Sequence, residues 1–526
     1  MTLENRNAFA YATIVAMGGL IFGLDAALIS GTLNFVAEEF GLSDLQIGSV
    51  VSAPAFGVLV ALPFAGYISN QLGRKKTIQI IALLYVVSAV GSALAPSFTA
   101  LVSARFLGGL AFSSLSMASM YIGEIAPPAY RGKLVAMIQI NIVIGLSGAY
   151  FINYLILQWT QSEAGWVEAL SLDEHTWRWM LGSEILPAIA WFALLLIVPE
   201  SPSWLLLRGR NKEARTILQR ILPQEEIEPH MEEMQGSLRQ SNEDRSIRAQ
   251  LAEIFSRPMR VTLIIAMTLA IAQQTTGINA VLFYAPSVFE QLGIGTDAAF
   301  QQAIWIGLSS LVFTALSLVL VDRFGRKPMI LWGMVWIVAS LGLCSYGFYS
   351  ARYVLSEADI YGMTEIPEFH RMFEMAGVEY GNDADFKDAL IAALGEADAR
   401  RFRGAIFEKA AKINPVLILV GILSFIGAFH FSVGPIMWVL FSELFPIAIR
   451  GVAIPFYTLV TSLTSSLVQQ FFPWQLATLG GAGTFLFYAL TVLIGLLILM
   501  RFLVETKNLS IEEIQRKLIL RSSSNA

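Results

Sequence analysis

Twelve long apolar stretches dominate this chain of 526 residues. A helix needs about 20 apolar residues to cross a bilayer, and these stretches are of that length. Strands of a membrane barrel are only about 10 residues long, so the stretches are helices. The sequence therefore predicts an all-α membrane protein with twelve transmembrane helices. The stretches lie at about 8–36, 47–69, 77–97, 100–126, 133–157, 179–199, 260–289, 299–321, 329–350, 414–442, 452–473 and 479–503.

The composition excludes several other classes of protein. Hydrophobic residues make up 55% of the chain and charged residues only 14%, against about 25% charged residues in soluble domains. Lys and Arg number 35 against 40 Asp and Glu, so no basic field for nucleic acid is expected. The single cysteine, Cys344, excludes an intramolecular disulfide framework and a cysteine-ligated metal site.

No metal, cofactor or enzymatic chemistry is expected either. The four histidines are scattered along the sequence and form no ligand motif. No Walker-type glycine loop is present, so the sequence does not predict direct use of ATP. Since no catalytic constellation is found, an enzyme is the weakest interpretation. Nothing in the sequence specifies an oligomeric state.

Lys and Arg in the short turns predict the orientation in the membrane. The turns at 37–46 and 290–298 contain none, so they should lie outside. The basic turns should be cytoplasmic, and both termini with them. The low cysteine content fits a bacterial inner (cell) membrane. The basic turns contain Arg74, Lys75, Lys76, Arg131, Lys133, Arg323, Arg326, Lys327 and Arg450.

Two motifs occur once in each half of the chain. The two copies of the Glu124 motif are further apart in the sequence than the two copies of the Gly73 motif. The second half therefore contains extra residues, and these lie between 327 and 443. Residues 351–412 are therefore an insertion on the outer side of a repeated six-span unit, the architecture of an alternating-access transporter. The predicted units are 1–204, a cytoplasmic helical linker at 205–258, and 259–526 with a short tail. The matching positions are Glu124, Pro127, Arg131 and Gly132 with Glu443, Pro446, Arg450 and Gly451, and Gly73-Arg74-Lys75 with Gly325-Arg326-Lys327.

Across nearly the whole chain except 351–412, the sequence resembles the sugar porter family of the major facilitator superfamily. This resemblance implies a fold of two six-helix halves and a neutral monosaccharide or polyol as substrate. The motifs that carry it are GLDAALISG (23–31), GRKK (73–76), RFLGGLAF (105–112), YIGEIAPPAYRGKL (121–134), PESPSWLL (199–206), QQTTGINAVLFYAP (273–286), VDRFGRKP (321–328), GPIMWVLFSELFPIAIRG (434–451) and VETKNLS (504–510).

Asp25 in the first span is the candidate proton site. A carboxylate is costly in hydrocarbon, so Asp25 should face the bundle interior, with Arg105 of the fourth span as its partner. Burial raises the proton affinity of a carboxylate, and a nearby cation lowers it. A site in which these two effects change with conformation can take up and release a proton. Proton-coupled members of the family carry these two residues. The alternative is a static ion pair that only holds helices together.

Amide side chains of the seventh span are the candidate substrate contacts. On a continuous helix Asn279 lies near the face that carries Gln273 and Gln274, and Gly277 between them allows local unwinding or close approach. Amides offer donors and acceptors that suit neutral hydroxyl groups. The resemblance implies sugar contact for these three residues, and the alternative is hydrogen bonding between helices. It implies the same for Gln139 and Trp438, and a place near the sugar or its outer gate for Phe22, Phe283, Tyr284 and Phe429, for which packing is the alternative.

Charged residues at the predicted cytoplasmic helix ends are the candidate gate. In the family they form a salt-bridge lattice between the halves when the cytoplasmic side is closed. The alternative for the arginines is simple positive-inside anchoring. His430 in span ten is a further titratable residue, with packing as its alternative. The gate residues are Arg74, Glu124, Arg131, Glu200, Asp322, Arg326, Glu443 and Arg450.

The sequence thus predicts a secondary transporter that imports a neutral monosaccharide or polyol with a proton. Its partners are the sugar, the proton and the lipid bilayer. A proton-independent facilitative uniporter is the first alternative. A non-transporting membrane sugar sensor is the second, although only 23 residues follow 503, where sensors carry long signalling tails. The insertion at 351–412 has three interpretations: a cap on the outer mouth, a partner site or a neutral insertion.

Overall fold

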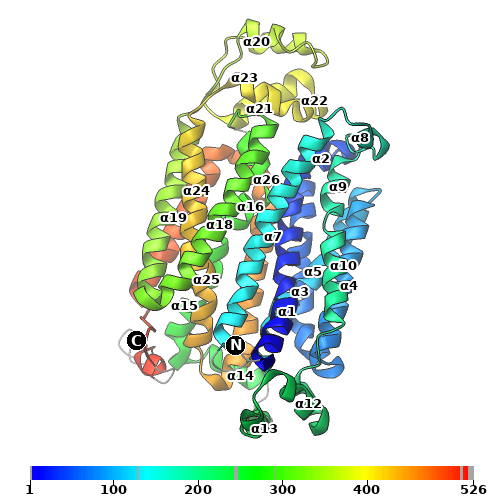
Figure 1. The fold of residues 1–526 in the computed structure, drawn as a ribbon. Helices are drawn as coiled ribbons and strands as arrows, with labels where there is room; N and C mark the ends of the chain where they lie inside the picture. The colour runs from blue at the N-terminus through cyan, green and yellow to red at the C-terminus, as the bar shows by residue number, and fades with distance from the viewer. Residues whose placement is uncertain (1–2, 127–129, 242–246, 291, 510–512, 519–526) are drawn as a thin grey trace.

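The computed structural model is a bundle of long, roughly parallel helices with a small folded unit at one end (Figure 1). It describes the chain except residues 1–2, 127–129, 242–246, 291, 510–512 and 519–526. Both chain termini lie at the other end of the bundle, together with the linker between the halves. We call this end the terminal end, and the end that carries residues 351–412 the insertion end.

Eleven helices of the described part are long and apolar enough to cross a membrane. The last one, Ile449–Phe502, has 54 residues. A straight helix of that length would measure about 80 Å, far more than a bilayer is thick. The helix turns back at Gly480, whose φ of 66° and ψ of 176° are not helical. It therefore supplies two spans, and the prediction of twelve is confirmed.

The N-terminal half supplies the first six spans. The fourth and the sixth are each broken near their middle, which the continuous apolar runs did not reveal. Ser43 begins the second span with a capping box to Gln46, and Ser97 caps the fourth. Its helices are α1 (Leu3–Leu28), η1 (Ile29–Gly31), α2 (Leu33–Phe40), α3 (Asp44–Leu72), α4 (Arg74–Ala93), α5 (Phe98–Ala111), α6 (Ser114–Ile125), α7 (Arg131–Thr160), α8 (Gly165–Ala169), α9 (Thr176–Gly182) and α10 (Ile185–Leu195).

The linker between the halves is helical and lies below the bundle in Figure 1. Ser201 caps its first helix, and Trp204 in that helix donates to the carbonyl of Asn70 at 2.8 Å. The linker is thereby attached to the terminal end of the N-terminal half. Its elements are α11 (Pro202–Leu207), α12 (Asn211–Ile221), η2 (Gln224–Glu226), α13 (Ile227–Ser241), α14 (Ile247–Ile254) and η3 (Arg257–Met259).

The C-terminal half supplies the other six spans. Its first span breaks after Gln274, and its fourth breaks at Ser432. Gly277 lies in the first break with φ of 78°, a backbone conformation that glycine adopts without strain. The helices are α15 (Arg260–Gln274), α16 (Ile278–Phe283), α17 (Ala285–Glu290), α18 (Thr296–Phe324), α19 (Arg326–Tyr349), α24 (Pro415–Phe431), α25 (Val433–Leu444) and α26 (Ile447–Phe502).

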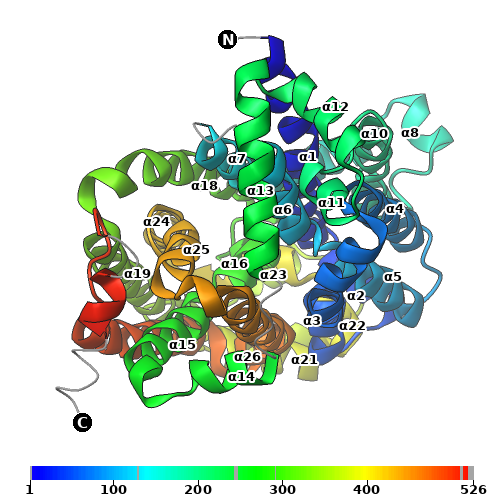
Figure 2. The same cartoon turned by 90° about the horizontal axis from the view of Figure 1, so that it is seen from below.

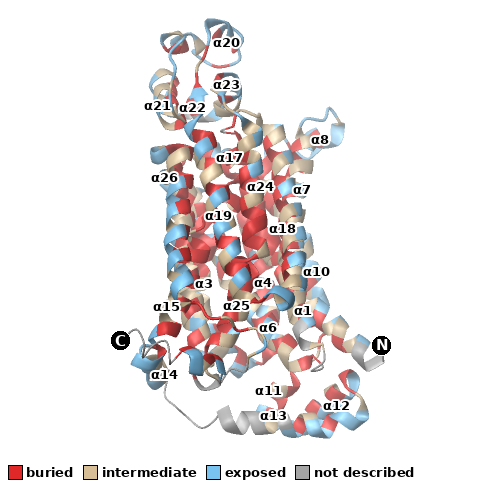
Figure 3. Ribbon diagram, turned by 90° about the vertical axis from the view of Figure 1, so that its left-hand side faces the viewer, coloured by how far each residue is buried: buried red, intermediate tan, exposed pale blue. Residues whose placement is uncertain are grey.

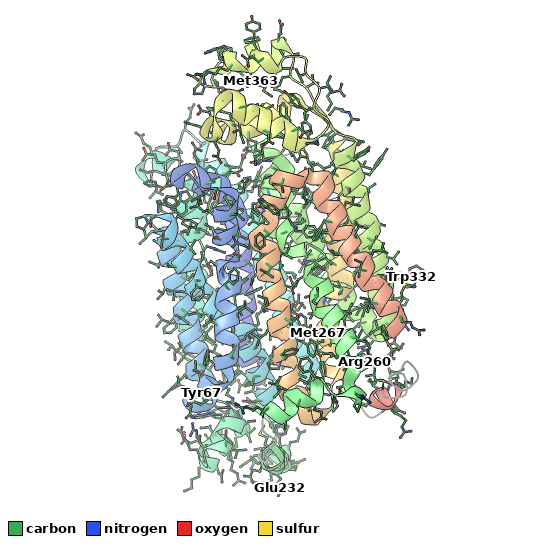
Figure 4. The ribbon with its side chains drawn as sticks, turned by 180° about the vertical axis from the view of Figure 1, so that it is seen from behind. Tyr67, Glu232, Arg260, Met267, Trp332 and Met363 are labelled. Atoms are coloured by element: carbon green, nitrogen blue, oxygen red, sulfur yellow. The ribbon has the colours of Figure 1, made fainter. Side chains whose placement is uncertain are left out.

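The insertion folds between α19 and α24. Its two ends pair as short antiparallel strands, with Arg352 opposite Lys412. It has a hydrophobic core of its own, separate from that of the bundle. Figure 4 marks it with Met363, at the opposite end from Glu232 of the linker. Its elements are β1 (Arg352–Tyr353), α20 (Glu357–Tyr361), η4 (Phe369–Met375), α21 (Asp383–Leu394), α22 (Glu396–Arg401), α23 (Arg403–Ala410) and β2 (Ala411–Lys412).

Seen from the terminal end, the two halves lie side by side, with α1, α4, α5 and α10 on one side and α15, α19, α24 and α26 on the other (Figure 2). Buried residues line the inner faces of the spans and fill the insertion, while exposed ones cover the outer faces (Figure 3). The halves are bonded toward the insertion end. There Asn34 donates to Glu290 at 2.6 Å, and Ser52 donates to Gln470 at 2.7 Å.

Candidate functional site

A buried ion pair lies inside the N-terminal half. Asp25 of α1 and Arg105 of α5 are 4% and 2% exposed, and Arg105 Nη1 lies 3.5 Å from Asp25 Oδ1. Arg105 also donates from Nε to the carbonyl of Val50 at 3.0 Å. Asp25 Oδ2 and Arg105 Nη1 have no hydrogen-bond partner in the described structure. The two predicted residues are therefore brought together, but as a loose pair with unused bonding capacity.

A second buried carboxyl group, that of Glu184, completes this cluster. Glu184 lies between α9 and α10, is 4% exposed and interacts with the carboxyl group of Asp25. Its Oε1 has no hydrogen-bond partner in the described structure. Two neighbouring carboxyl groups in low dielectric do not both ionise readily, so the charge on one depends on the charge on the other. The sequence reasoning missed Glu184, although an ionisable residue inside the predicted 179–199 span was the signal that marks such a site.

The amides of the seventh span form a hydrogen-bonded chain inside the C-terminal half. Gln273 donates to the carbonyl of Gly434 of α25 at 3.2 Å, and Gln274 donates to Gln273 at 2.9 Å. Asn279 donates to Gln274 at 2.9 Å. The span is not a continuous helix: it breaks between Gln274 and Ile278, around Gly277. The break, and not a shared helix face, brings Asn279 to Gln274.

The chain of amides continues to α26 through residues that the sequence reasoning did not single out. Asn279 donates to Ser465 Oγ at 2.8 Å, and Gln469 Nε2 donates to the same oxygen at 2.7 Å. Tyr284, a predicted substrate-contact residue, donates to the carbonyl of Gln469 at 3.1 Å. Polar residues one turn apart in an apolar span were the available signal. Four helices of the C-terminal half, α15, α16, α25 and α26, thus meet in one polar network.

Two more predicted substrate residues flank this network. Phe429, at the end of α24, packs its ring against Gly434, the residue whose carbonyl accepts from Gln273. Trp438 follows one turn later on α25, is 41% exposed and meets Phe441 edge to face at 5.9 Å. An exposed indole next to a polar network offers both an apolar face and an N–H donor.

Three more predicted substrate residues lie on three different helices. Gln139 is half-buried on α7 of the N-terminal half. Phe22 is half-buried on α1 and packs edge to face on Phe112 at 4.5 Å. Phe283 is half-buried at the end of α16. Gln139 and Phe22 thus belong to the N-terminal half, and Phe283 belongs to the C-terminal half.

At the terminal end of the N-terminal half, charged residues form a compact cluster. Arg74 binds Glu124 through Nη2 at 3.1 Å and donates to Asn70 Oδ1 at 2.7 Å. Ser201 donates a very short hydrogen bond to Glu124. Glu200 accepts from the backbone N–H of Lys75 at 3.0 Å, at the start of α4. A carboxylate at this position stabilises the helix N-terminus.

The C-terminal half repeats this cluster residue by residue. Arg326 binds Glu443 through Nη2 at 3.0 Å and Asp322 at 3.0 Å, and Thr506 donates to Glu443 at 2.6 Å. Glu505 accepts from the backbone N–H of Arg326 at 3.1 Å, at the start of α19. Each cluster therefore bonds within its own half. The lattice between halves that the resemblance implies is not the arrangement of these pairs here.

The last predicted residues to be located are two charged gate residues and His430. Arg450 donates to the carbonyl of Phe445 at 3.1 Å. The side chain of Arg131 lies outside the described part of the structure. His430 is buried, with Nδ1 3.2 Å from the hydroxyl of Thr314. This hydrogen bond between α24 and α18 fits the packing interpretation of His430. Among the described residues, no group of three or more His, Cys, Asp or Glu is placed to hold a metal ion.

The fold and the site define a class: a multi-pass membrane protein with two repeated six-helix halves and a polar interior, as in secondary transporters. The family model of the sugar (and other) transporters matches residues 11–366 and 400–518. The chain belongs to this family, and the resemblance seen in the sequence is confirmed.

Two curated relatives are similar over almost their full length. The arabinose-proton symporter of Bacillus subtilis is 31% identical over 504 residues, covering 95% of this chain and 92% of that protein. The D-xylose-proton symporter of Escherichia coli is 31% identical over 541 residues, covering 96% and 95%. The solved inward-open conformation of the E. coli xylose transporter matches with a TM-score of 0.72 at 28% identity, covering 97% of this chain and 99% of that one.

Proposed function

We propose that this protein imports a neutral monosaccharide or polyol together with a proton, by alternating access. The observation that carries the proposal is the division of the interior into a charged cluster and an amide network. The cluster around Asp25 and Arg105 fits a proton. The network around Gln274 and Asn279 fits uncharged hydroxyl groups. The symport named for the arabinose and xylose relatives supports the same pairing of substrates.

In the proposed cycle Asp25 is the group that binds and releases the proton. Arg105 contacts the deprotonated carboxylate at 3.5 Å, which is a longer separation than a strong charge-assisted hydrogen bond has. A proton on Asp25 removes its negative charge and therefore weakens its attraction to Arg105. Glu184, which interacts with the same carboxyl group, adjusts how readily the proton is held. Release of the ion pair allows the loaded transporter to reorient.

The sugar is bound by the amide network in this proposal. Gln273, Gln274 and Asn279 exchange hydrogen bonds with one another for hydrogen bonds to hydroxyl groups. About as many hydrogen bonds form to the sugar as are lost between the amides. The amides can therefore be fully hydrogen-bonded both without and with the sugar. Trp438 supplies an apolar face for sugar C–H groups, and Gln139 supplies a contact from the opposite half. Phe22, Phe283, Tyr284 and Phe429 shape the pocket and its outer gate.

The charged clusters at the terminal end form the proposed cytoplasmic gate. The basic turns at this end support a cytoplasmic position for it and for both termini, with the protein in the inner membrane. In the present state the halves are bonded toward the insertion end, and each cluster bonds within its own half. Closure of the terminal end would bring the two clusters together and exchange partners between them.

Uptake into proteoliposomes tests the proposal. Labelled glucose, galactose, xylose and myo-inositol are offered with and without an inward proton gradient. We expect one of them to accumulate above equilibrium with the gradient, and one pH unit supports about tenfold accumulation by one-to-one symport. The matched control is Asp25→Asn, which keeps the side-chain size and removes the ionisable group.

The alternatives give different results in the same assay. A sugar that enters but only equilibrates, equally fast with Asp25→Asn, identifies a uniporter and contradicts proton coupling. A sugar that binds the purified protein without entering the vesicles identifies a sensor. Accumulation that persists unchanged in Asp25→Asn contradicts the assignment of the proton to this residue.

A further inference from the structure

Residues 351–412 form a folded unit and not a loose loop. The rings of Tyr353 and Phe386 stack at 5.5 Å, and Phe407 meets Phe386 edge to face at 5.1 Å. Tyr353 and Phe386 are fully buried, and β1 pairs with β2 where the chain enters and leaves the unit. The family model does not match 367–399, so the middle of this unit is an addition to the common fold.

The unit is fastened to the C-terminal half by Asp383. This residue is the first of α21, is 5% exposed and accepts from the backbone N–H of Gly481 with both oxygens at 3.1 Å. Gly481 follows the turn at Gly480 and begins the last span. A carboxylate at a helix N-terminus satisfies an otherwise unpaired N–H and complements the helix dipole. The unit is therefore bonded to the C-terminal half by a buried contact in addition to its two chain connections.

The same helix reaches the N-terminal half one turn later. Lys387 Nζ lies 3.4 Å from the carboxylate of Asp44, the first residue of α3, with only 15% and 29% of the two side chains exposed. A second pair lies further along, where Arg401 Nε is 3.3 Å from Glu38 of α2. This pair is about half exposed. Two cations of the unit thus bind two acids of the opposite half.

We propose that residues 351–412 act as an electrostatic clamp that holds the insertion end closed, through the pairs Lys387–Asp44 and Arg401–Glu38. Alternating access requires the two halves to separate at this end in the opposite state. Asp383 keeps the unit on the C-terminal half, so both ion pairs have to break when the halves separate. The clamp therefore favours the state seen here over the state open at the insertion end.

The solvent exposure of the two ion pairs determines how strongly they favour the closed state. An exposed ion pair contributes little, and a partly buried pair somewhat more, so we expect loss of both pairs to shift the equilibrium about tenfold. Exposed pairs are screened by salt, so the shift should shrink as ionic strength rises. These two properties distinguish a clamp from a unit that merely covers the surface.

Distance measurements between the halves test the proposal without any transported substrate. Spin labels are placed on cysteines at Leu94 and Val416, exposed positions at the insertion end of the two halves, with Cys344 replaced by Ser. The full chain is measured in lipid nanodiscs at low salt. In Lys387→Gln/Arg401→Gln we expect the fraction with long distances to rise about tenfold.

Arg371→Gln is the matched control. Arg371 binds Glu368 at 2.9 Å within the unit, so this variant removes a cation without touching the N-terminal half. We expect its distances to equal those of the unmodified chain. The exchange of charges in Lys387→Asp/Asp44→Lys should restore most of the closed population that Lys387→Asp alone loses.

The proposal is overturned if the double variant and Arg371→Gln give the same distances at low salt. A salt titration of the unmodified chain gives a second readout that does not depend on how the variants fold. There, a closed population that is insensitive to salt contradicts the clamp. Neither result bears on sugar or proton transport, so this test and the uptake test fail independently.

Discussion

The N-terminal half carries charge at its centre, where Asp25, Arg105 and Glu184 lie together, whereas the C-terminal half carries amides. Yet the two halves are nearly identical at the terminal end, where Arg74–Glu124 and Arg326–Glu443 repeat the same contacts. The repeat has therefore been kept where the halves meet the membrane surface and has diverged where ligands would bind. The proposed proton site and the amide network of the proposed sugar site therefore belong to different halves, so each can be altered separately.

Of the variants considered, Asp25→Asn should have the largest effect, and the effect should be on proton-driven accumulation. The variant cannot release a proton, so accumulation driven by a pH gradient should fall from about tenfold per pH unit to none. Exchange of labelled for unlabelled sugar should remain, because the amide network is untouched. The measurement is uptake and counterflow in the same proteoliposomes. Loss of sugar binding together with coupling would show that the halves are not separable.

Gln274→Ala should weaken sugar binding and leave coupling intact. The variant removes an acceptor for Asn279 and a donor to Gln273, and it leaves partners unsatisfied. The free-energy cost of leaving buried polar groups without partners corresponds to an affinity loss of about 10- to 100-fold. The sugar that does enter should still be accumulated by the proton gradient. The measurement is the concentration dependence of uptake, with Gln475→Ala as an amide control outside the network.

Glu184→Gln should have a smaller effect that appears in the pH profile. The variant keeps the side-chain shape and removes an ionisable carboxyl group that interacts with Asp25. The two carboxyl groups interact, so the loss of one of them should displace the pH profile of uptake by about one unit. Sugar affinity at the optimum should not change. A profile that stays in place while the protein merely becomes less stable would assign Glu184 a packing role only.

Glu200→Gln and Glu505→Gln should have the smallest effects and equal ones. Each carboxylate accepts from backbone N–H groups at the start of a span, α4 or α19. Loss of the charge at such a position costs about 1 kcal/mol and lowers the melting temperature by about 2 °C. Thermal unfolding in detergent measures both. A strong effect in one half only would show that the repeat is not equivalent even at its ends.

Much of the architecture could be predicted because it follows from local sequence. The apolar stretches predict the spans, and the paired motifs at Gly73 and Gly325 predict the two halves, which the structure and the family match confirm. Asp25 and Arg105 could be paired because buried charges in a membrane require partners. Apart from the unwinding that Gly277 allows, the breaks within spans could not be seen, since a broken and a continuous apolar helix have the same hydropathy.

Contacts between distant parts of the chain were decided by the tertiary structure. Glu184 is a single acid in an apolar stretch, and only the packing of its span on α1 and α4 makes it a neighbour of Asp25. Ser465 joins Asn279 because two helices cross, although 186 residues separate them. The roles proposed for these residues remain predictions for the experiments above.

The sequence by itself determined the class of this protein, its twelve helices and its repeat, because burial of apolar side chains in lipid and satisfaction of the backbone within each helix are local requirements. Only the tertiary structure decided which polar groups meet. It placed the amides in one network, put Glu184 beside Asp25 and bound the insertion to both halves through Asp383 and Lys387. Such pairings depend on how helices cross and turn in three dimensions, and the hydropathy of the sequence does not specify this arrangement.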